Sequence, residues 1–298
     1  MSNPVPDTLA HAAAPHGGGE ENMFSTLLHH VFDAPEIELP FLGHVHLPHF
    51  EPVRIAGLSL DLSITKHVVF LWFSAALLIL VVWAAARANR RNAVPKGLGN
   101  VVEVFVTFIR DEIVLPNMGP GGLRYMPYLL TTFFFILVMN LMGLVPYGAS
   151  ATGNVNVTAG LALIAFVMIQ GAAIRSQGLG HYLAHLTGGV HWSLWPIMVP
   201  IEILGLFTKP FALCIRLFAN MTGGHIVIVS LIGLIFIFKS YLVALGPVVF
   251  VVGILFLELF VAFLQAYVFT MLTALFMGLG MKTGEHDGGH GEEAAHGH

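Results

Sequence analysis

Six charged side chains lie in the long apolar part of the chain between Tyr125 and Met281, and they are the residues best suited to do chemistry there. They are Arg175, Glu202, Lys209, Arg216, Lys239 and Glu258. Arg175 and Lys239 lie at the ends of apolar runs, so their long side chains can reach a membrane surface. Placing an arginine or glutamate at the centre of a bilayer costs about 2.5 to 3.5 kcal/mol, so the other four need water, a partner or a function.

Four polar residues share one face of the apolar run from residue 197 to 238. Glu202 and Arg216 are fourteen residues apart, nearly four helical turns, so they lie on the same face about 21 Å apart along the axis. Lys209 falls midway between them, and Asn220 lies one turn beyond Arg216. The spacing predicts a polar stripe through an apolar helix.

A second polar stripe is predicted in the last apolar run, where Glu258 and Gln265 are seven residues apart. If the two stripes face each other, they can line a hydrated path. His225 adds an imidazole that can take up and release a proton near neutral pH. The alternatives are an Arg/Glu pair that only holds two helices together and an interfacial His225, but ionisable groups inside a membrane are usually functional.

The composition identifies the chain as an integral membrane protein, because 56% of its 298 residues are hydrophobic and only 10% are charged. Its single cysteine, Cys214, excludes an intrachain disulfide. The small net charge of −4 and the lack of a basic stripe exclude nucleic acid as a partner. No fixed ligand spacing predicts a metal site, and no cofactor is expected.

Apolar runs of spanning length predict an all-α membrane domain over residues 65–281 with about five spans. The spans are expected near residues 66–86, 125–147, 157–174, 197–238 and 248–281. A charged apolar segment at 97–113 fits an interfacial helix better than a span. Residues 1–64 are expected to form an extramembrane or interfacial segment, and the low-complexity, His-rich tail at 282–298 is expected to be disordered.

The orientation follows from a basic cluster after the first span. Arg87, Arg90, Arg91 and Lys96 lie close behind it, so the positive-inside rule places them in the cytoplasm and the N-terminus outside. Five spans then place the C-terminus in the cytoplasm. Residues 1–22 lack the basic and apolar regions of a secretory signal, so the first span is expected to direct insertion.

One of the predicted spans is too long for an upright helix. The 42 residues from 197 to 238 would form a helix roughly 60 Å long, about twice the hydrocarbon thickness. Residue composition leaves open whether this run is two spans or one strongly tilted helix. Pro210 is expected to kink it.

Two stretches in this region resemble subunit a of the F-type ATP synthase, which carries protons to and from a rotating c-ring. They are "PFALCIRLFANMTGGH" and "LELFVAFLQAYVFTMLTALF", supported by "NVNVTAGLAL" and "EILGLFTKPFALCIR". The resemblance covers about residues 65–281. It implies that the last two helices are long and tilted and form a hairpin against the c-ring, so the 42-residue run is one element.

The resemblance also implies roles for individual residues. Arg216 matches the family's essential arginine, which faces the c-ring carboxylate and separates two half-channels. Gln265 matches the glutamine near that arginine, and Asn220 matches the asparagine one turn further on.

Weaker matches line the two half-channels. Glu202 and Lys209 match polar positions on the same long helix, with Glu202 lining the cytoplasmic access path. Asn154 and Asn156 lie in a polar loop that resembles the mouth of the opposite half-channel. His225 and Glu258 occur in the order that resembles mitochondrial subunits, whereas many bacterial relatives carry the carboxylate first and the histidine second.

The function implied by the resemblance is proton translocation in the Fo sector, without catalysis by this chain alone. The implied partners are the c-ring, the subunit b peripheral stalk, the rest of the F1Fo complex and the lipid bilayer of a bacterial plasma membrane. The alternatives are a self-contained proton-coupled secondary transporter or channel and, less well supported, an intramembrane metalloenzyme that uses histidines such as His181 and His185. Internal repeats that mark many transporters are not found in the sequence, and the histidines lack an HExxH pattern.

Overall fold

The computed structural model describes the long helices, several short helical turns and four short strands. The described residues are 36–39, 43–46, 53–55, 58–60, 66–91, 97–145, 151–180, 182, 195–238 and 241–282. Most of the predicted N-terminal segment lies outside these residues, as do His181, His185 and all of the predicted tail except Lys282.

Five segments are long and apolar enough to cross a bilayer, as the sequence predicts, and the chain is an all-α membrane protein. Their main helices are α2 (Lys66–Arg91), α5 (Met126–Gly143), α6 (Val155–Gln177), α8 (Trp195–Phe238) and α9 (Tyr241–Lys282), and the second segment also includes the residues just before α5. Shorter helical elements connect them: α3 (Leu98–Phe108), the π-helix η1 (Ile109–Val114), α4 (Leu115–Met118) and the 3-10 helices η2 (Pro120–Tyr125) and η3 (Ala151–Gly153).

The segment before α2 contains two small antiparallel hairpins that the sequence analysis did not predict. Strand β1 (Glu36–Leu39) pairs with β2 (Gly43–His46), and β3 (Val53–Ile55) pairs with β4 (Leu58–Leu60). Their strands are three or four residues long. Such short apolar runs give too little periodicity to distinguish a strand from an irregular segment.

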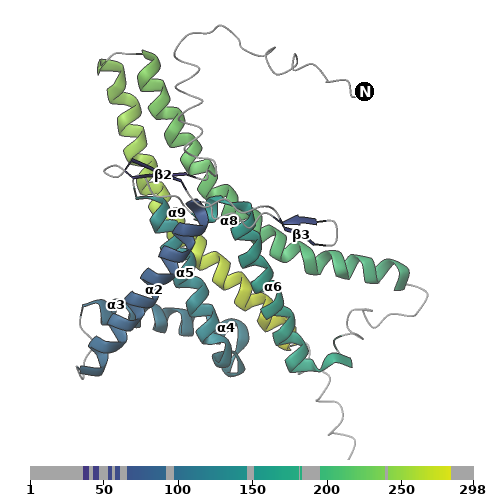
Figure 1. Ribbon diagram of the computed structural model, residues 1–298. Helices are drawn as coiled ribbons and strands as arrows, with labels where there is room; N and C mark the ends of the chain where they lie inside the picture. The colour runs from purple at the N-terminus through teal and green to yellow at the C-terminus, as the bar shows by residue number, and fades with distance from the viewer. Residues whose placement is uncertain are drawn as a thin grey trace, which may run out of the picture.

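The long run at residues 197–238 is one helix rather than two spans. Helix α8 continues through Pro200 and Pro210 for 44 residues, which corresponds to about 66 Å. Figure 1 shows the first part of α8 running across the view and its last part rising beside the first part of α9. The two helices therefore form the hairpin that the family resemblance implies.

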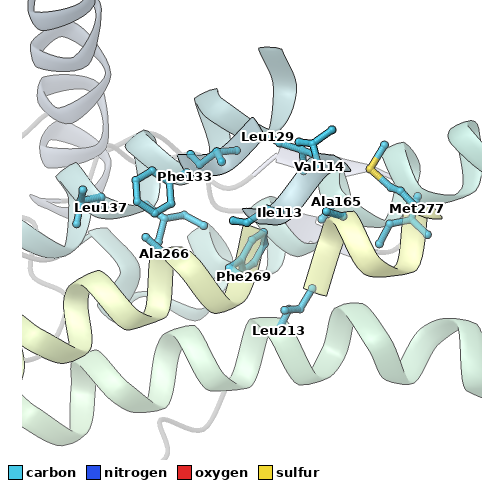
Figure 2. Packing of buried hydrophobic residues seen from close by; sticks show 14 of the residues in the cluster. Ile113, Val114, Leu129, Phe133, Leu137, Ala165, Leu213, Ala266, Phe269 and Met277 are labelled. Carbon is cyan, nitrogen blue, oxygen red and sulfur yellow. The ribbon is translucent and has the colours of Figure 1, made fainter. Parts of the chain in front are cut away.

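The core lies where α5 and α9 meet, with α6, α8 and η1 packed around them. Figure 2 shows Ala266 and Phe269 of α9 close to Phe133 of α5 and Ile113 of η1, with Leu213 contributed by α8. Small residues allow close helix contacts, which matter in lipid because apolar burial alone gives no driving force there. At Gly280, for example, an added Cβ would lie only 2.8 Å from the Cβ of Ala173.

The segment predicted as an interfacial helix is partly built into this core. It is not among the candidate spans, but Ile109, Ile113 and Val114 are fully buried. Its charges stay outside: Arg110 donates a hydrogen bond to Asp111 at 2.7 Å, and this bond lowers the pKa of the Asp111 carboxyl. The segment thus combines an exposed charged face with an apolar face that supports α5 and α9.

Candidate functional site

A hydrogen bond joins the two predicted polar stripes in the middle of the hairpin. Nδ2 of Asn220 on α8 donates to Oε1 of Gln265 on α9 at 2.7 Å. Gln265 is 2% exposed, and its Nε2 has no hydrogen-bond partner among the described residues. The structure therefore brings these two amides together, as the stripes require, and leaves one buried donor available.

Arg216 lies one helical turn before Asn220, about 6 Å along the axis. Its side chain is exposed, and its neighbours Phe211 and Ile215 are exposed as well. In the described part of the chain, Arg216 makes no ion pair or hydrogen bond. A permanent positive charge is thus presented on an open apolar surface next to the amide bridge.

Glu258 lies two turns from Gln265 on α9 and packs against Gly224, one turn beyond Asn220 on α8. It is 5% exposed, and an added Cβ at Gly224 would lie 2.7 Å from its Oε1. Neither carboxyl oxygen has a hydrogen-bond partner among the described residues, and the same is true of Nε2 of the adjacent His225. The structure places the two members of the predicted His/carboxylate pair in one region without a direct hydrogen bond between them.

Two residues at the start of α2, which the sequence analysis did not select, lie near this pair. Lys66 and His67 are close enough to His225 for their charges to act on its imidazole. His67 is 4% exposed, and its Cε1 would lie 3.8 Å from a Cβ at Gly153 in η3. Because they begin a predicted span, their positions in the sequence do not distinguish them from ordinary residues at the end of a membrane helix.

A buried polar bridge on α5 was also missed. Thr152 Oγ1 donates to Asn140 Oδ1 at 2.9 Å, and Asn140 Nδ2 donates to the backbone oxygen of Ala262 at 3.3 Å. Both side chains are fully buried. This bridge holds α5 and η3 to α9 between Glu258 and Gln265. The amide of Asn140 inside an apolar span is the signal that could have identified it.

The two asparagines predicted at a half-channel mouth take part in a helix cap. Asn154 precedes α6, and its Oδ1 accepts a hydrogen bond from the backbone N–H of Asn156 at 2.8 Å. Asparagine is favoured at this position because it satisfies a free N–H of the first turn. Asn156 has an exposed side chain, so only its backbone is committed to the cap.

A second polar group lies near the start of α8. The hydroxyl of Tyr182 donates to Oε1 of Gln170 on α6 at 2.7 Å. Burial, together with the negative charge of Glu202, raises the pKa of the Tyr182 phenol, so the phenol keeps its proton at neutral pH. Glu202 therefore lies within electrostatic reach of Tyr182, although no hydrogen bond joins them in the described residues.

Lys209 does not join Glu202 in an ion pair in the described structure. Its Nζ lies 5.0 Å from the ring centroid of Phe276 on α9, a cation–π arrangement. Further along, Ser176 Oγ donates to the Met281 carbonyl at 3.2 Å, and Gln177 Nε2 donates to the Gly280 carbonyl. These contacts hold the C-terminal ends of α6 and α9 together.

The polar residues thus form two groups separated along the hairpin. Contacts of Gly224 with Glu258, Asn220 with Gln265 and Lys209 with Phe276 follow an antiparallel register. On α8, Glu202 lies about 21 Å from Arg216 in one direction, and His225 lies about 13 Å from it in the other. Groups of three metal-binding side chains are not found in the described segments. The arrangement is suited to proton transfer at two levels, with a fixed cation between them.

Comparisons with known proteins find a matching family and several relatives. The sequence profile of the family described as ATP synthase A chain matches residues 68–278. The chain is 52% identical to ATP synthase subunit a 2 of Chlorobaculum tepidum, over 97% of this chain and 84% of the relative. It is also 52% identical to ATP synthase subunit a of Chloroherpeton thalassium, over 90% and 80%. The corresponding subunit of Anaeromyxobacter dehalogenans is 50% identical, over 94% and 76%.

Proposed function

Because this chain belongs to the ATP synthase A chain family, the proton-translocating subunits of the Fo sector, we propose that Arg216 separates two half-channels that open on opposite sides of the membrane. The chain is a component of a larger complex in a bacterial inner membrane rather than a stand-alone enzyme. Family membership also argues against the two alternatives, a self-contained transporter and a metalloenzyme.

The observation that carries the proposal is the exposed Arg216 beside the Asn220–Gln265 bridge. A guanidinium stays protonated at all working pH values, so it does not relay protons, but it attracts a carboxylate. The exposed apolar side chains around it offer a surface for a neighbouring helix. We propose that this neighbour is a c-ring helix whose carboxylate meets Arg216 during each step of rotation.

The outer half-channel is proposed to contain His225 and Glu258, with Asn154 and Asn156 near its mouth. Unpartnered buried polar atoms on His225 and Glu258 support this role, because such atoms are costly in a dry interior and are satisfied by water. A proton that enters here neutralises the c-ring carboxylate, which can then face lipid.

The inner half-channel is proposed to run past Glu202, with Lys209 as a weaker candidate. After nearly a full turn the rotor carboxylate reaches this side and releases its proton to the cytoplasm. Each charge that crosses the membrane releases about 2.3 kcal/mol per 100 mV. Forced alternation between the two half-channels converts this free energy into rotation.

The domain boundaries, the orientation in the membrane and the contact with subunit b are part of the same proposal. Residues 65–281 are proposed as the membrane domain and 1–64 as the extramembrane or interfacial segment, and the predicted tail after Lys282 lies outside the described residues. The N-terminus lies outside and the C-terminus in the cytoplasm, so His225 and Glu258 belong to the outer half and Glu202 to the inner half. Subunit b binds as the peripheral stalk.

The test is ATP-driven proton pumping in inverted vesicles that carry the complex with Arg216→Ala. We expect pumping to be lost while the complex remains assembled. Passive proton leak through the same vesicles, measured after removal of the soluble ATPase, shows whether the two half-channels have become connected. Leu163→Ala is the control, because it removes an exposed apolar side chain of α6, outside the hairpin that carries Arg216, and it should pump normally. Normal pumping by Arg216→Ala would refute the separator role.

A further inference from the structure

His67 is a buried imidazole at the end of the membrane where the outer half-channel is proposed. It is 4% exposed and begins α2, a helix that packs against α5 and η3. Its ring lies beside Gly153 in the turn that precedes α6. The histidine is therefore enclosed by the elements that surround the start of the proposed path rather than directed at lipid.

The neighbourhood of His67 is rich in groups that can hold a proton. Lys66 precedes it on α2, and η3, whose Gly153 lies beside the His67 ring, packs against α8, the helix that carries His225. Beyond His225, Glu258 of α9 packs on Gly224 with both carboxyl oxygens unpartnered in the described structure. Titratable groups are thus contributed by three helices.

Electrostatics make these groups interdependent. Like charges repel strongly where water is largely excluded, so two imidazoles and an ammonium group in one region do not all carry charge at low cost. A proton on one ring therefore disfavours a proton on the other, and the pair titrates jointly. Such coupling favours the passage of a proton from one group to the next.

We propose that the outer half-channel extends to α2, and that His67 is a further proton-accepting residue that passes protons to His225 and Glu258. This inference rests on the half-channel arrangement proposed above. His67 takes a proton from outer water on one ring nitrogen and releases it, through intervening water, to the imidazole of His225 or the carboxylate of Glu258. The proton then goes to the rotor carboxylate, and neutral His67 accepts the next one.

The test compares three variants in the assembled complex. His67→Gln keeps a polar side chain of similar reach but removes the titratable ring, and His67→Glu restores a group that can carry a proton. Ser74→Ala is the matched control, because Ser74 is fully buried on the same face of α2, seven residues further on. ATP-driven pumping and passive proton conduction are measured from about pH 5 to about pH 9. This interval extends ~1.5 pH units below and ~2.5 above the ordinary imidazole pKa of about 6.5.

We expect His67→Gln to slow conduction several-fold and to flatten its pH dependence near neutral pH. His67→Glu should recover conduction, with its pH dependence displaced to lower pH, and Ser74→Ala should match the native complex. Native conduction and pH dependence in assembled His67→Gln would overturn the inference. An equal loss in Ser74→Ala without a changed pH profile would overturn it as well, because that result indicates packing alone.

The same vesicles distinguish this inference from the proposed function. If Arg216→Ala loses pumping while His67→Gln behaves as native, only the extension to α2 is wrong. If Arg216→Ala pumps normally, the half-channel arrangement itself is wrong.

The native complex provides a second measurement that does not depend on assembly of a variant. Deuterium exchange at the imidazole C2 position, followed by mass spectrometry, reports whether a histidine meets water and titrates. We expect His67 to exchange with a pH-dependent rate. Absence of exchange in the native complex would show a dry ring and would overturn the inference.

Discussion

At the scale of single residues, the site combines one hydrogen bond between two amides with several buried polar atoms that have no partner among the described residues. The Asn220–Gln265 bond fixes the spacing of α8 and α9, whereas His225 Nε2 and the Glu258 carboxyl have no hydrogen-bond partners in the described segments. A group that must exchange protons has to remain accessible to a donor or acceptor that comes and goes. The contrast therefore separates positioning residues from proton-carrying residues.

A substitution at Gly224 can test whether proton pumping depends on the position of the Glu258 carboxyl group. We expect Gly224→Ala to displace the carboxyl group, because the added Cβ would lie 2.7 Å from Oε1 and the flexible end of the Glu258 side chain can move away at little cost. ATP-driven proton pumping should fall, with the complex still assembled.

Gly223→Ala is the control for this experiment, since an added Cβ there meets no atom within 4 Å. Both glycines lie in the same helix, so both replacements change helix propensity in the same way. Equal pumping by the two variants would contradict the proposed role of the close approach at Gly224.

The sequence predicted which residues share a helix face, but not all of their partners. The spacing of Glu258 and Gln265 placed them on one stripe, and the structure shows that this stripe meets α8. Residue spacing could not identify His67 or the Asn140–Thr152 bridge, because their importance depends on contacts between residues far apart in the chain. Helical periodicity describes one helix at a time.

At the scale of elements, close contacts between helix backbones set the position of α9. Gly278 lies against the backbone of Asn117 at the end of α4, and an added Cβ would overlap the Asn117 carbonyl group. A small residue at such a crossing lets two elements approach without a side chain between them. The short connecting segment between α3 and α5 thus acts as a support for the C-terminal end of the hairpin.

We expect Gly278→Ala to weaken this support by about 1 to 3 kcal/mol, the typical cost of overpacking a core. The amount of the chain retained in membranes, and the temperature at which the solubilised complex dissociates, should both fall. Gly253→Ala on the same helix meets no atom within 4 Å and should leave both unchanged. A Gly278→Ala complex as stable as the native one would show that α9 tolerates a shift at this crossing.

The existence of the long helices followed from apolar run length, but their continuity did not. The run at 197–238 was compatible with two spans until the family resemblance favoured one, and the structure describes a single helix through two prolines. The β-hairpins before α2 were not predicted, because strands of three or four residues leave almost no periodic pattern.

At the scale of the whole molecule, the five candidate spans predict that successive connections between helices lie on alternate sides of the membrane. Val145 follows α5 and Leu179 follows α6, and both are exposed. They therefore provide accessible positions at the two ends of the helix bundle. Cys214, the only cysteine in the sequence, is buried, so it gives little background in a labelling experiment.

We expect a cysteine at Val145 (Val145→Cys) to react with an impermeant maleimide only from the outer side. Leu179→Cys should react only from the cytoplasmic side. Both are introduced into the Cys214→Ser chain, and intact cells and inverted vesicles expose the two sides in turn. Labelling of both positions from the same side would contradict the five-span topology, and a reversed pattern would contradict the orientation of the N-terminus.

The exposed Arg216 also has a consequence for the life of the chain before assembly. Lipid can cover the apolar side chains around it, but lipid does not neutralise a guanidinium, whose insertion costs about 2.5 to 3.5 kcal/mol. Since 1.4 kcal/mol corresponds to a factor of ten, a partner carboxylate can bias the chain toward the assembled state by roughly two orders of magnitude. Under the proposed function, Arg216 thus also favours assembly of a newly inserted chain with its rotor neighbour.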